Sequence, residues 1–198
     1  MSKIITIGRQ FGSGGRELGK RLAEAMGIGY FDREVISEIA RKSGLAETYV
    51  NNFVEKRAGY YPITIGRTFY APMTLQMDTE VYRAQTAAIR ELAGRGDCVI
   101  IGRCADYILE DMHPVNLFVF SDMESRIARC RRKAPSDEHL TDNELRKKIL
   151  AVDKSRAKYY EFYTGQTWGK MQHYHLCINT AGREIKALIP AVRAFVEA

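Results

Sequence analysis

Cysteine is scarce in this sequence, and histidine follows no pattern. Cys98, Cys104, Cys130 and Cys177 include no C-x-x-C pair, and the four histidines show neither metal-ligand nor catalytic spacing. A disulfide framework and a zinc site are therefore not indicated. We expect reduced, mostly buried cysteines.

Long apolar runs are also absent. No stretch approaches the roughly 20 apolar residues that cross a bilayer, and Met1-Ser2-Lys3 leads directly into a predicted strand without the apolar region of a signal peptide. Repeats, low-complexity tracts and long linkers are missing too. The 198 residues, 45% of them hydrophobic, suit a single cytoplasmic α/β domain over 1–198 with no membrane partner.

The chain is basic, with 30 Lys and Arg against 24 Asp and Glu and a formal charge of +6. Such a balance raises nucleic-acid binding as one hypothesis. The positions of the arginines favour a different hypothesis, a pocket for a small nucleotide. Many of them stand near predicted strand ends and helix starts, where an α/β sheet binds small phosphorylated ligands. The run Arg129–Lys133 fits a solvated basic face about equally well. We expect small nucleotide ligands and no nucleic acid, and the sequence leaves the oligomeric state open. The arginines concerned are Arg9, Arg16, Arg33, Arg83, Arg103, Arg126, Arg129, Arg131, Arg132 and Arg156.

Short β-branched or apolar runs alternate with helical patterns along the chain. This alternation predicts a parallel sheet with helices on both faces. The five predicted strands are Ile4 to Ile7, Gly29 to Phe31, Cys98 to Ile101, Val115 to Phe120 and His175 to Ile178.

Residues 44–94 separate the second and third predicted strands, which is too long for a plain crossover. Gly59, Pro62, Gly66 and Pro72 predict a helix-free connection over 58–74. A helix is expected to begin near Ala46, and another over Leu75 to Gly94. This segment suits a helical lobe that binds a phosphoryl acceptor; a purely structural elaboration is the alternative.

The most informative pattern is a glycine-rich turn between the first strand and the first helix. Gly12, Ser13, Gly14 and Gly15 follow Ile4 to Ile7 and precede the helical pattern of Leu18 to Met26. Glycines there permit positive φ and close approach of an anion, while backbone N–H groups and the helix dipole point at it. The pattern predicts a phosphate-binding loop; a strand-to-helix turn without a ligand is the alternative.

The loop lacks the lysine of the G-x-x-x-x-G-K-[ST] pattern. Gly15 stands at the lysine position and Arg16 at the Ser/Thr position. Arg9 and Arg16 are available substitutes, because an arginine fork also binds phosphate oxygens.

A lid is predicted over about 133–164. Thr141 and Glu144 have capping-box spacing, and the helical pattern that follows puts Asp153 and Arg156 within one turn on the same side. The aromatic residues between Tyr159 and Trp168 favour packing over base stacking. Asn179 to Gly182 could line an adenine pocket through backbone groups.

In order, these segments resemble bacterial cytidylate kinases, and more closely the cytidylate kinase-like branch with an R-x-[FY]-G-S-G-G-R-E loop. The resemblance is carried by the glycine loop, Tyr30-Phe31-Asp32, Val99-Ile100-Ile101-Gly102-Arg103, Val115 to Arg126, and Asp153-Lys154-Ser155-Arg156. It implies a three-layer P-loop fold with strand order 2-3-1-4-5, ATP as phosphoryl donor, Mg²⁺, and a pyrimidine monophosphate such as CMP or dCMP as acceptor.

The resemblance also implies roles for single residues. Backbone N–H groups of Gly12, Ser13, Gly14 and Gly15 bind the donor phosphates, Asp32 and Arg103 lie at the acceptor site, and Asp153 and Arg156 orient the acceptor and bridge the phosphates. From the residues themselves, we expect Arg9, Arg16 and Glu17 on the donor side and Arg33, beside Asp32, on the acceptor side. The expected catalytic residues are Arg16, Arg103, Asp153 and Arg156, and Asp153 also contributes to acceptor binding.

Three departures from the family pattern accompany the likeness. The loop lysine is missing, Ile101 replaces the acid at the end of the third strand, and Cys104 replaces the aspartate after Arg103. Asp106 or Glu17 is a candidate for a metal-side role; a solvent-exposed carboxylate is the alternative for each. The functional alternatives are a kinase for another small metabolite and a nucleotide-binding or regulatory domain without catalysis.

Overall fold

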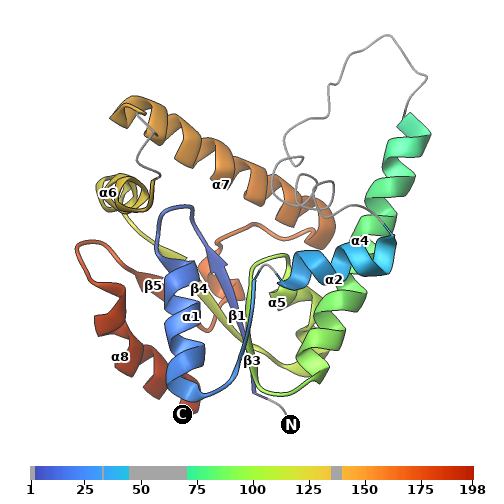
Figure 1. The fold of residues 1–198 in the computed structure, drawn as a ribbon, viewed down its shortest axis with the longest axis horizontal. Coiled ribbons are helices and arrows are strands. Elements are labelled where there is room, and N and C mark those ends of the chain that lie inside the picture. Colours follow the sequence, from blue (N-terminus) through green and yellow to red (C-terminus); the bar gives the residue numbers. More distant parts are fainter. Residues whose placement is uncertain (1–2, 33, 45–70, 135–139) are drawn as a thin grey trace.

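A five-stranded parallel sheet forms the centre of the chain (Figure 1). The computed structural model describes residues 3–32, 34–44, 71–134 and 140–198. The strands lie in the order β2-β3-β1-β4-β5, and each neighbouring pair is parallel. This confirms the predicted α/β P-loop topology. The strands are β1 (Ile4–Arg9), β2 (Gly29–Phe31), β3 (Cys98–Ile101), β4 (Val115–Phe120) and β5 (Leu176–Asn179).

Helices cover both faces of the sheet. Successive strand residues point to opposite faces, so Ile5 and Ile7 pack with α1 and α8, whereas Ile4 and Ile100 pack with α2, α4, α5 and the end of α7. Two apolar cores result, one on each face. The helices are α1 (Gly15–Met26), α2 (Glu34–Ser43), α4 (Ala71–Gly94), α5 (Ala105–Ile108), α6 (Met123–Lys133), α7 (Asp142–Thr164) and α8 (Ile185–Glu197), with 3₁₀ turns η2 (Glu110–Met112) and η3 (Met171–His173).

The helix before β3 begins earlier than predicted. α4 starts at Ala71, so the expectation of a helix-free connection through residue 74 is wrong for residues 71–74. Pro72 lies in the first turn of α4, where the missing proline N–H has no intrahelical acceptor and therefore costs little. The rest of that connection, and the helix expected near Ala46, lie outside the described residues.

The predicted lid helix is present as α7 and lies beside α6 (Figure 1). The Thr141 hydroxyl accepts a hydrogen bond from the Glu144 N–H, and the Glu144 carboxylate accepts one from the Thr141 N–H, which confirms the capping box. A small apolar cluster joins α6 to α7 and includes Ile127, Leu145 and Ile149, with Phe11 of the glycine loop packed against it. The α6–α7 pair thus packs onto the glycine loop. Residues 135–139, between the two helices, lie outside the described residues.

The aromatic residues of α7 serve mainly as packing. Tyr159 and Tyr160 are buried in the core on the α4 face. Tyr163 stacks on Tyr82 of α4 with ring centroids 4.0 Å apart and an interplanar angle of 6°. Phe162 is exposed. Among the described helices, none has the length and apolar character needed to span a membrane.

Candidate nucleotide site

The glycine loop has the backbone geometry of an anion nest. Gly12 and Gly14 adopt φ values of 77° and 86°, and Gly14 is the N-cap of α1. Because the N-cap is glycine, it places no side chain over the amides of the first helical turn, which together with the helix dipole attract an anion. A Cβ on Gly12 would lie 3.0 Å from the Arg126 carbonyl oxygen and 3.1 Å from Cys130 Sγ, so α6 approaches the loop closely at this point.

Hydrogen bonds from two neighbouring strands fix the loop. The Gln10 N–H donates to the Val119 carbonyl (3.0 Å), and Gln10 Oε1 accepts from the Ser121 N–H (3.2 Å). Thr180, just after β5, donates its hydroxyl to the Ser13 carbonyl (2.7 Å). The loop is therefore held at the carboxyl ends of β4 and β5.

A buried ion pair clamps the loop to the lid. The Asp153 carboxylate accepts a hydrogen bond from the Phe11 N–H (2.7 Å) and pairs with Arg126. Arg126 Nε donates to the Phe11 carbonyl (2.7 Å). The side chains of Arg126 and Asp153 are only 5% and 13% exposed. Both peptide groups of Phe11 are thus tied to α6 and α7, and Asp153 acts on the loop directly.

Four arginines converge beside the loop. Arg9 stands at the end of β1, and the charges of Arg156, Arg103 and Arg16 all act on it. Burial, followed by the charge of Arg156, lowers the pKa of Arg9 to about 9, with Asp32 acting in the opposite direction. Like charges gathered in this way are unfavourable unless an anion joins them. The cluster is a candidate site for a polyanionic ligand.

The acceptor candidates Asp32 and Arg103 lie at adjacent strand ends. Asp32 is buried after β2 and pairs with Arg16 through Nε–Oδ2 at 2.6 Å and Nη2–Oδ1 at 3.3 Å. Arg103 follows β3 with a φ of 61°, a left-handed conformation that side chains rarely adopt. Gln85 of α4 donates to the Arg103 carbonyl (3.0 Å). A buried amide thus holds the backbone at the strained residue.

Arg156 joins α7 to the arginine cluster. Its Nη1 donates to the Arg9 carbonyl (3.1 Å), and its guanidinium carbon lies 5.6 Å from the centre of the Phe11 ring. Asp153 Oδ1 is 3.9 Å from Arg156 Nη1, as the helical spacing predicted.

Two cavities adjoin the cluster. The loop cavity, of about 320 Å³, is lined by the glycine loop, α6 and α7 and includes Arg16, Arg129, Lys133 and Lys148. The inner cavity, of about 60 Å³, lies behind Arg9 and includes Arg103, Asp106, Tyr160 and Trp168. The loop cavity has room for a polyphosphate, whereas the inner one has room for a group of about phosphate size.

Neither candidate metal-side carboxylate stands free for a metal. Burial acts to raise the pKa of Glu17, but hydrogen bonds from Lys133 and Arg21 outweigh burial, and the pKa is lowered overall. Asp106 accepts a hydrogen bond from the Tyr160 hydroxyl (2.8 Å), and burial raises its pKa. Within the described residues no group of three or more His, Cys, Asp or Glu side chains could hold a metal ion. These residues do not form a protein cage for Mg²⁺, an ion that phosphates and water commonly hold.

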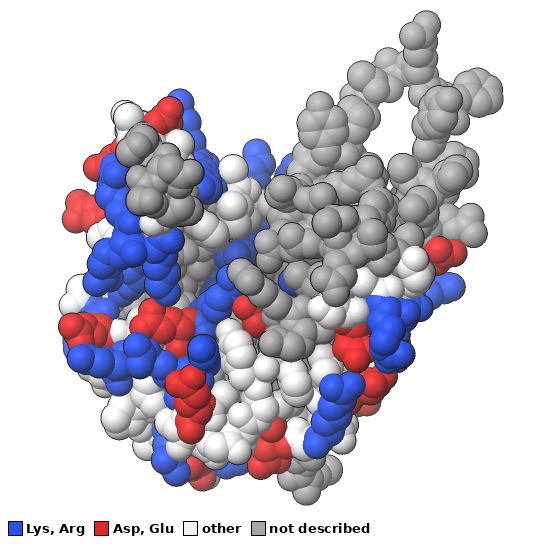
Figure 2. All heavy atoms as spheres, in the orientation of Figure 1, with Lys and Arg blue, Asp and Glu red and all other residues white. Residues whose placement is uncertain are grey.

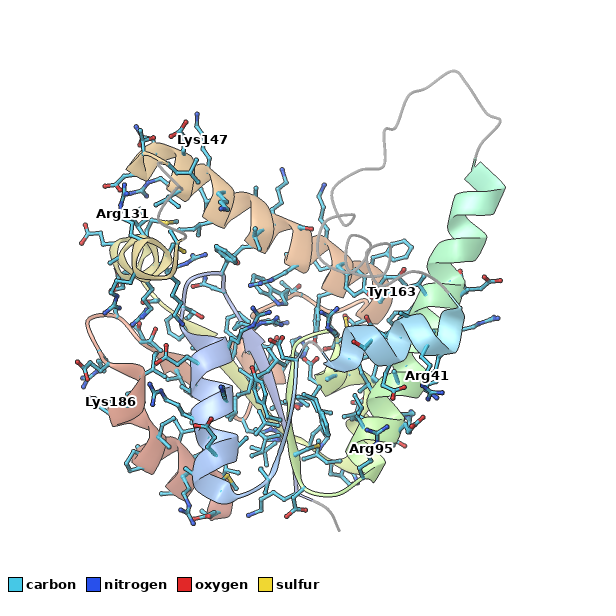
Figure 3. The ribbon with its side chains drawn as sticks, viewed as in Figure 1. Arg41, Arg95, Arg131, Lys147, Tyr163 and Lys186 are labelled. Carbon is cyan, nitrogen blue, oxygen red and sulfur yellow. The ribbon has the colours of Figure 1, made fainter. Side chains whose placement is uncertain are left out.

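The structure resolves the ambiguity of the basic run on α6. Arg126 and Arg129 are buried toward the loop, whereas Arg131 and Arg132 are exposed. Figure 3 shows Arg131 and Lys147 of α7 projecting outward, and Figure 2 shows basic side chains gathered on this side of the molecule. Helical periodicity therefore divides the run between the site and the solvent.

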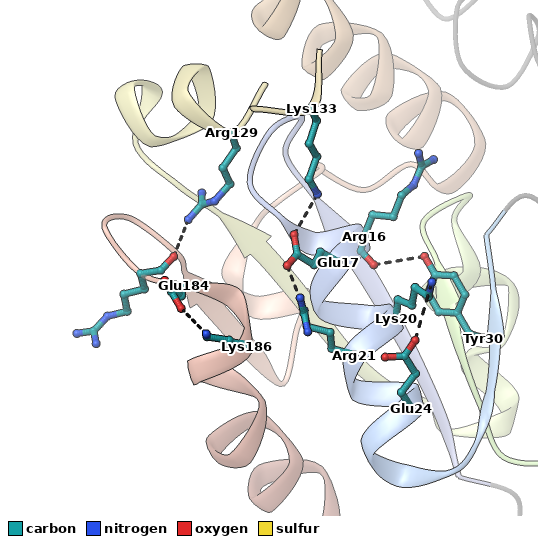
Figure 4. Close-up of polar contacts among 11 residues, drawn as sticks. Arg16, Glu17, Lys20, Arg21, Glu24, Tyr30, Arg129, Lys133, Glu184 and Lys186 are labelled. Carbon is teal, nitrogen blue, oxygen red and sulfur yellow. Dashed lines mark hydrogen bonds and ion pairs between the residues drawn. The ribbon is translucent and has the colours of Figure 1, made fainter. Parts of the chain in front are cut away.

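Three site residues were not individually assigned from the sequence. Arg129 donates to the Arg183 carbonyl (3.1 Å) and to the Thr180 carbonyl, beside the segment proposed to line an adenine pocket. Lys133 reaches Glu17 at 3.0 Å (Figure 4), and Lys148 lines the loop cavity. The basic pattern of α6 and α7 was the available signal. Their approach to the loop depends on how the helices pack.

The structure brings nearly all of the expected site residues to one end of the sheet. They are Arg9, Gly12, Ser13, Gly14, Gly15, Arg16, Glu17, Asp32, Arg103, Asp153 and Arg156. Arg33 lies outside the described residues. Arg83, which was grouped with these arginines, is exposed on α4.

A family model described as the cytidylate kinase-like family matches residues 4–182. The chain belongs to this family. The match spans the glycine loop, the strand ends and α7, so the elements that form the candidate site lie within the matched range.

Individual relatives of this cytidylate kinase-like protein are distant. It is 24% identical over 191 residues to a cytidylate kinase from Methanopyrus kandleri, covering 91% of this chain and 86% of the relative. An uncharacterized protein from Eubacterium ventriosum has a similar fold, with a TM-score of 0.73, 23% identity, and coverage of 100% and 99% of the two chains. A shikimate kinase from Bacteroides thetaiotaomicron gives a TM-score of 0.58 at 16% identity, with full coverage of both chains. These structural likenesses show the fold.

Proposed function

We propose that this cytidylate kinase-like protein transfers the γ-phosphoryl group of ATP, supplied with Mg²⁺, to a small phosphorylated acceptor, with CMP or dCMP as the first candidates. One observation carries the proposal: a polyphosphate-sized cavity at the glycine loop adjoins a phosphate-sized cavity, and Arg9 and Arg156 line both. Family membership supports the kinase class. The name of the Methanopyrus kandleri relative supports the acceptor.

Phosphoryl transfer requires positioning and positive charge more than covalent chemistry from the protein. An ionised phosphate oxygen of the acceptor attacks the γ-phosphorus, and the bond from the γ-phosphorus to the bridging oxygen breaks, which leaves ADP. The loop amides hold the donor, Arg103 holds the acceptor, and Arg156 stabilises charge as the group passes. The clamp of Asp153 and Arg126 fixes the loop for this geometry.

A domain that binds nucleotide without catalysis is the second candidate. Arg16 stands where the Ser/Thr of the loop pattern would be and pairs with the buried Asp32. This pairing engages the Asp32 carboxylate, and Arg16 offers no oxygen ligand at the position where a Ser/Thr hydroxyl would hold Mg²⁺. It favours nucleotide binding with slow or absent turnover.

The test is an ADP-release assay with ATP, Mg²⁺ and a panel of CMP, dCMP, UMP, AMP and shikimate. Arg156→Met controls for a contaminating host kinase, whose activity would not respond to this change, and the exposed Arg193→Met is its matched surface control. Transfer to CMP or dCMP that disappears only in Arg156→Met supports the proposal. ATP binding without transfer to any acceptor supports the non-catalytic candidate, and transfer to another acceptor alone refutes the pyrimidine assignment.

A further inference from the structure

Arg9 occupies the junction of the two cavities. It stands at the last position of β1, just before the glycine loop, and lines both the loop cavity and the inner cavity. A group that passes from a donor in one cavity to an acceptor in the other must cross this junction. Arg9, like Arg156, therefore lies where a cation can contact the transferred group in both cavities, and Arg9 is the one of the two that belongs to the strand leading into the loop.

Two glycines make room for Arg9. A Cβ on Gly15 would lie 2.6 Å from Arg9 Cβ, and a Cβ on Gly102 would lie 1.6 Å from Arg9 Nη1. Any side chain at either position would displace the arginine. Gly15 stands at the lysine position of the loop pattern. The stem of Arg9 packs against this glycine, where the pattern would have the lysine side chain.

The other two loop-side arginines are held by different partners. Arg16 forms a two-point pair with Asp32 and is half exposed. Arg156 donates to the Arg9 carbonyl and lies over the Phe11 ring. The charged groups that act on the Arg9 guanidinium are Arg156 from α7, Arg103 after β3, Arg16 on α1 and, with opposite sign, Asp32 after β2. The net field around Arg9 is positive, as a site for the terminal phosphate of a donor requires.

We infer that Arg9 takes the place of the missing loop lysine and contacts the γ-phosphoryl group of the bound nucleotide. This assignment rests on the proposed function for its catalytic meaning. The contact itself is a binding property, which can be measured whether or not the chain turns over.

The experiment compares ATP with ADP binding by calorimetry, because the two ligands differ by the γ-phosphoryl group. Arg9→Met keeps the stem that packs on Gly15 and removes the charge, while Arg90→Met changes an exposed arginine paired with Asp111. Loss of a charged hydrogen bond weakens ATP binding about 10- to 100-fold. In Arg9→Met, ADP affinity falls less than about threefold. Arg9→Lys binds ATP more tightly than Arg9→Met does, and Arg90→Met binds both nucleotides as the wild type does.

A second variant displaces the Arg9 side chain without substituting Arg9 itself. Gly102→Ala pushes a methyl group into the guanidinium and is expected to reduce ATP affinity selectively, as Arg9→Met does. Gly27→Ala is the matched control, since Gly27 has nearly the same φ (67° against 65°) and no atom within 4 Å of its Cβ position. Adding Gly102→Ala to Arg9→Met should weaken ATP binding no further.

Equal losses of ATP and ADP affinity in Arg9→Met, or an unchanged ATP preference, would overturn the assignment even if the chain is a kinase. Selective loss in a chain that transfers phosphate to no acceptor would leave Arg9 assigned and refute the proposed function.

Discussion

The clamp between the lid and the loop gives the sharpest prediction about stability. Asp153→Ala removes the carboxylate that faces Arg126, whose side chain is only 5% exposed. Breaking one partner of a buried pair leaves an uncompensated charge and costs about 3–5 kcal/mol. For a chain of this length that cost lowers Tm by roughly 6–20 °C. Urea unfolding followed by circular dichroism measures the free energy directly.

Two comparisons separate the clamp from a general effect of losing an aspartate. Asp142→Ala breaks the pair with Arg131, in which both side chains are largely exposed, and should cost less than about 1 kcal/mol. Arg126→Met combined with Asp153→Leu leaves no buried charge unpaired. The double variant should therefore be more stable than Asp153→Ala by at least about 1 kcal/mol.

The resemblance to cytidylate kinases instead implies that Asp153 orients the acceptor. The free energy of unfolding of Asp153→Ala could lie within about 1 kcal/mol of the wild-type value while phosphoryl transfer is lost. In that case the aspartate orients the acceptor, and the reasoning from the clamp fails.

Three further outcomes are expected. Arg156→Ala should lower kcat by about 10³-fold or more while changing ATP affinity far less, because its contact forms chiefly in the transition state; equal losses in single-turnover and binding assays would contradict that role. Asp106→Asn should raise Tm relative to wild type by more at pH 8 than at pH 5. Burial raises the pKa of Asp106, so ionising this carboxyl in the folded state costs folding free energy as the pH rises from its unfolded pKa through its folded pKa. Thermal melts in which the variant shifts Tm equally at both pH values would count against this reasoning. Thr141→Ala should cost about 1 kcal/mol through loss of the α7 cap, measured by urea unfolding, and no change would show that the cap is dispensable.

The sequence was sufficient for the sheet because each strand is a short apolar run bounded by local signals. Ile4 to Ile7 and Val115 to Phe120 consist mostly of apolar or β-branched residues, and the glycine loop follows from residue types at fixed offsets. Pro72 misled the prediction, since a proline in a first helical turn looks the same in sequence as one that breaks a helix.

The site was only partly predictable because several contacts depend on packing between helices. That Asp153 and Arg156 share one side of α7 follows from helical spacing alone. That the Asp153 carboxylate faces Arg126 and Phe11 instead of open space depends on how α6 lies against α7, through apolar contacts such as Ile127 with Ile149. No local sequence pattern encodes how two helices pack against each other.

One consequence follows from the length of α7. The helix pairs with the loop through Asp153 and, more than two turns further on, stacks Tyr163 on Tyr82 of α4. One helix therefore holds two segments that lie far apart in the sequence, the glycine loop and α4.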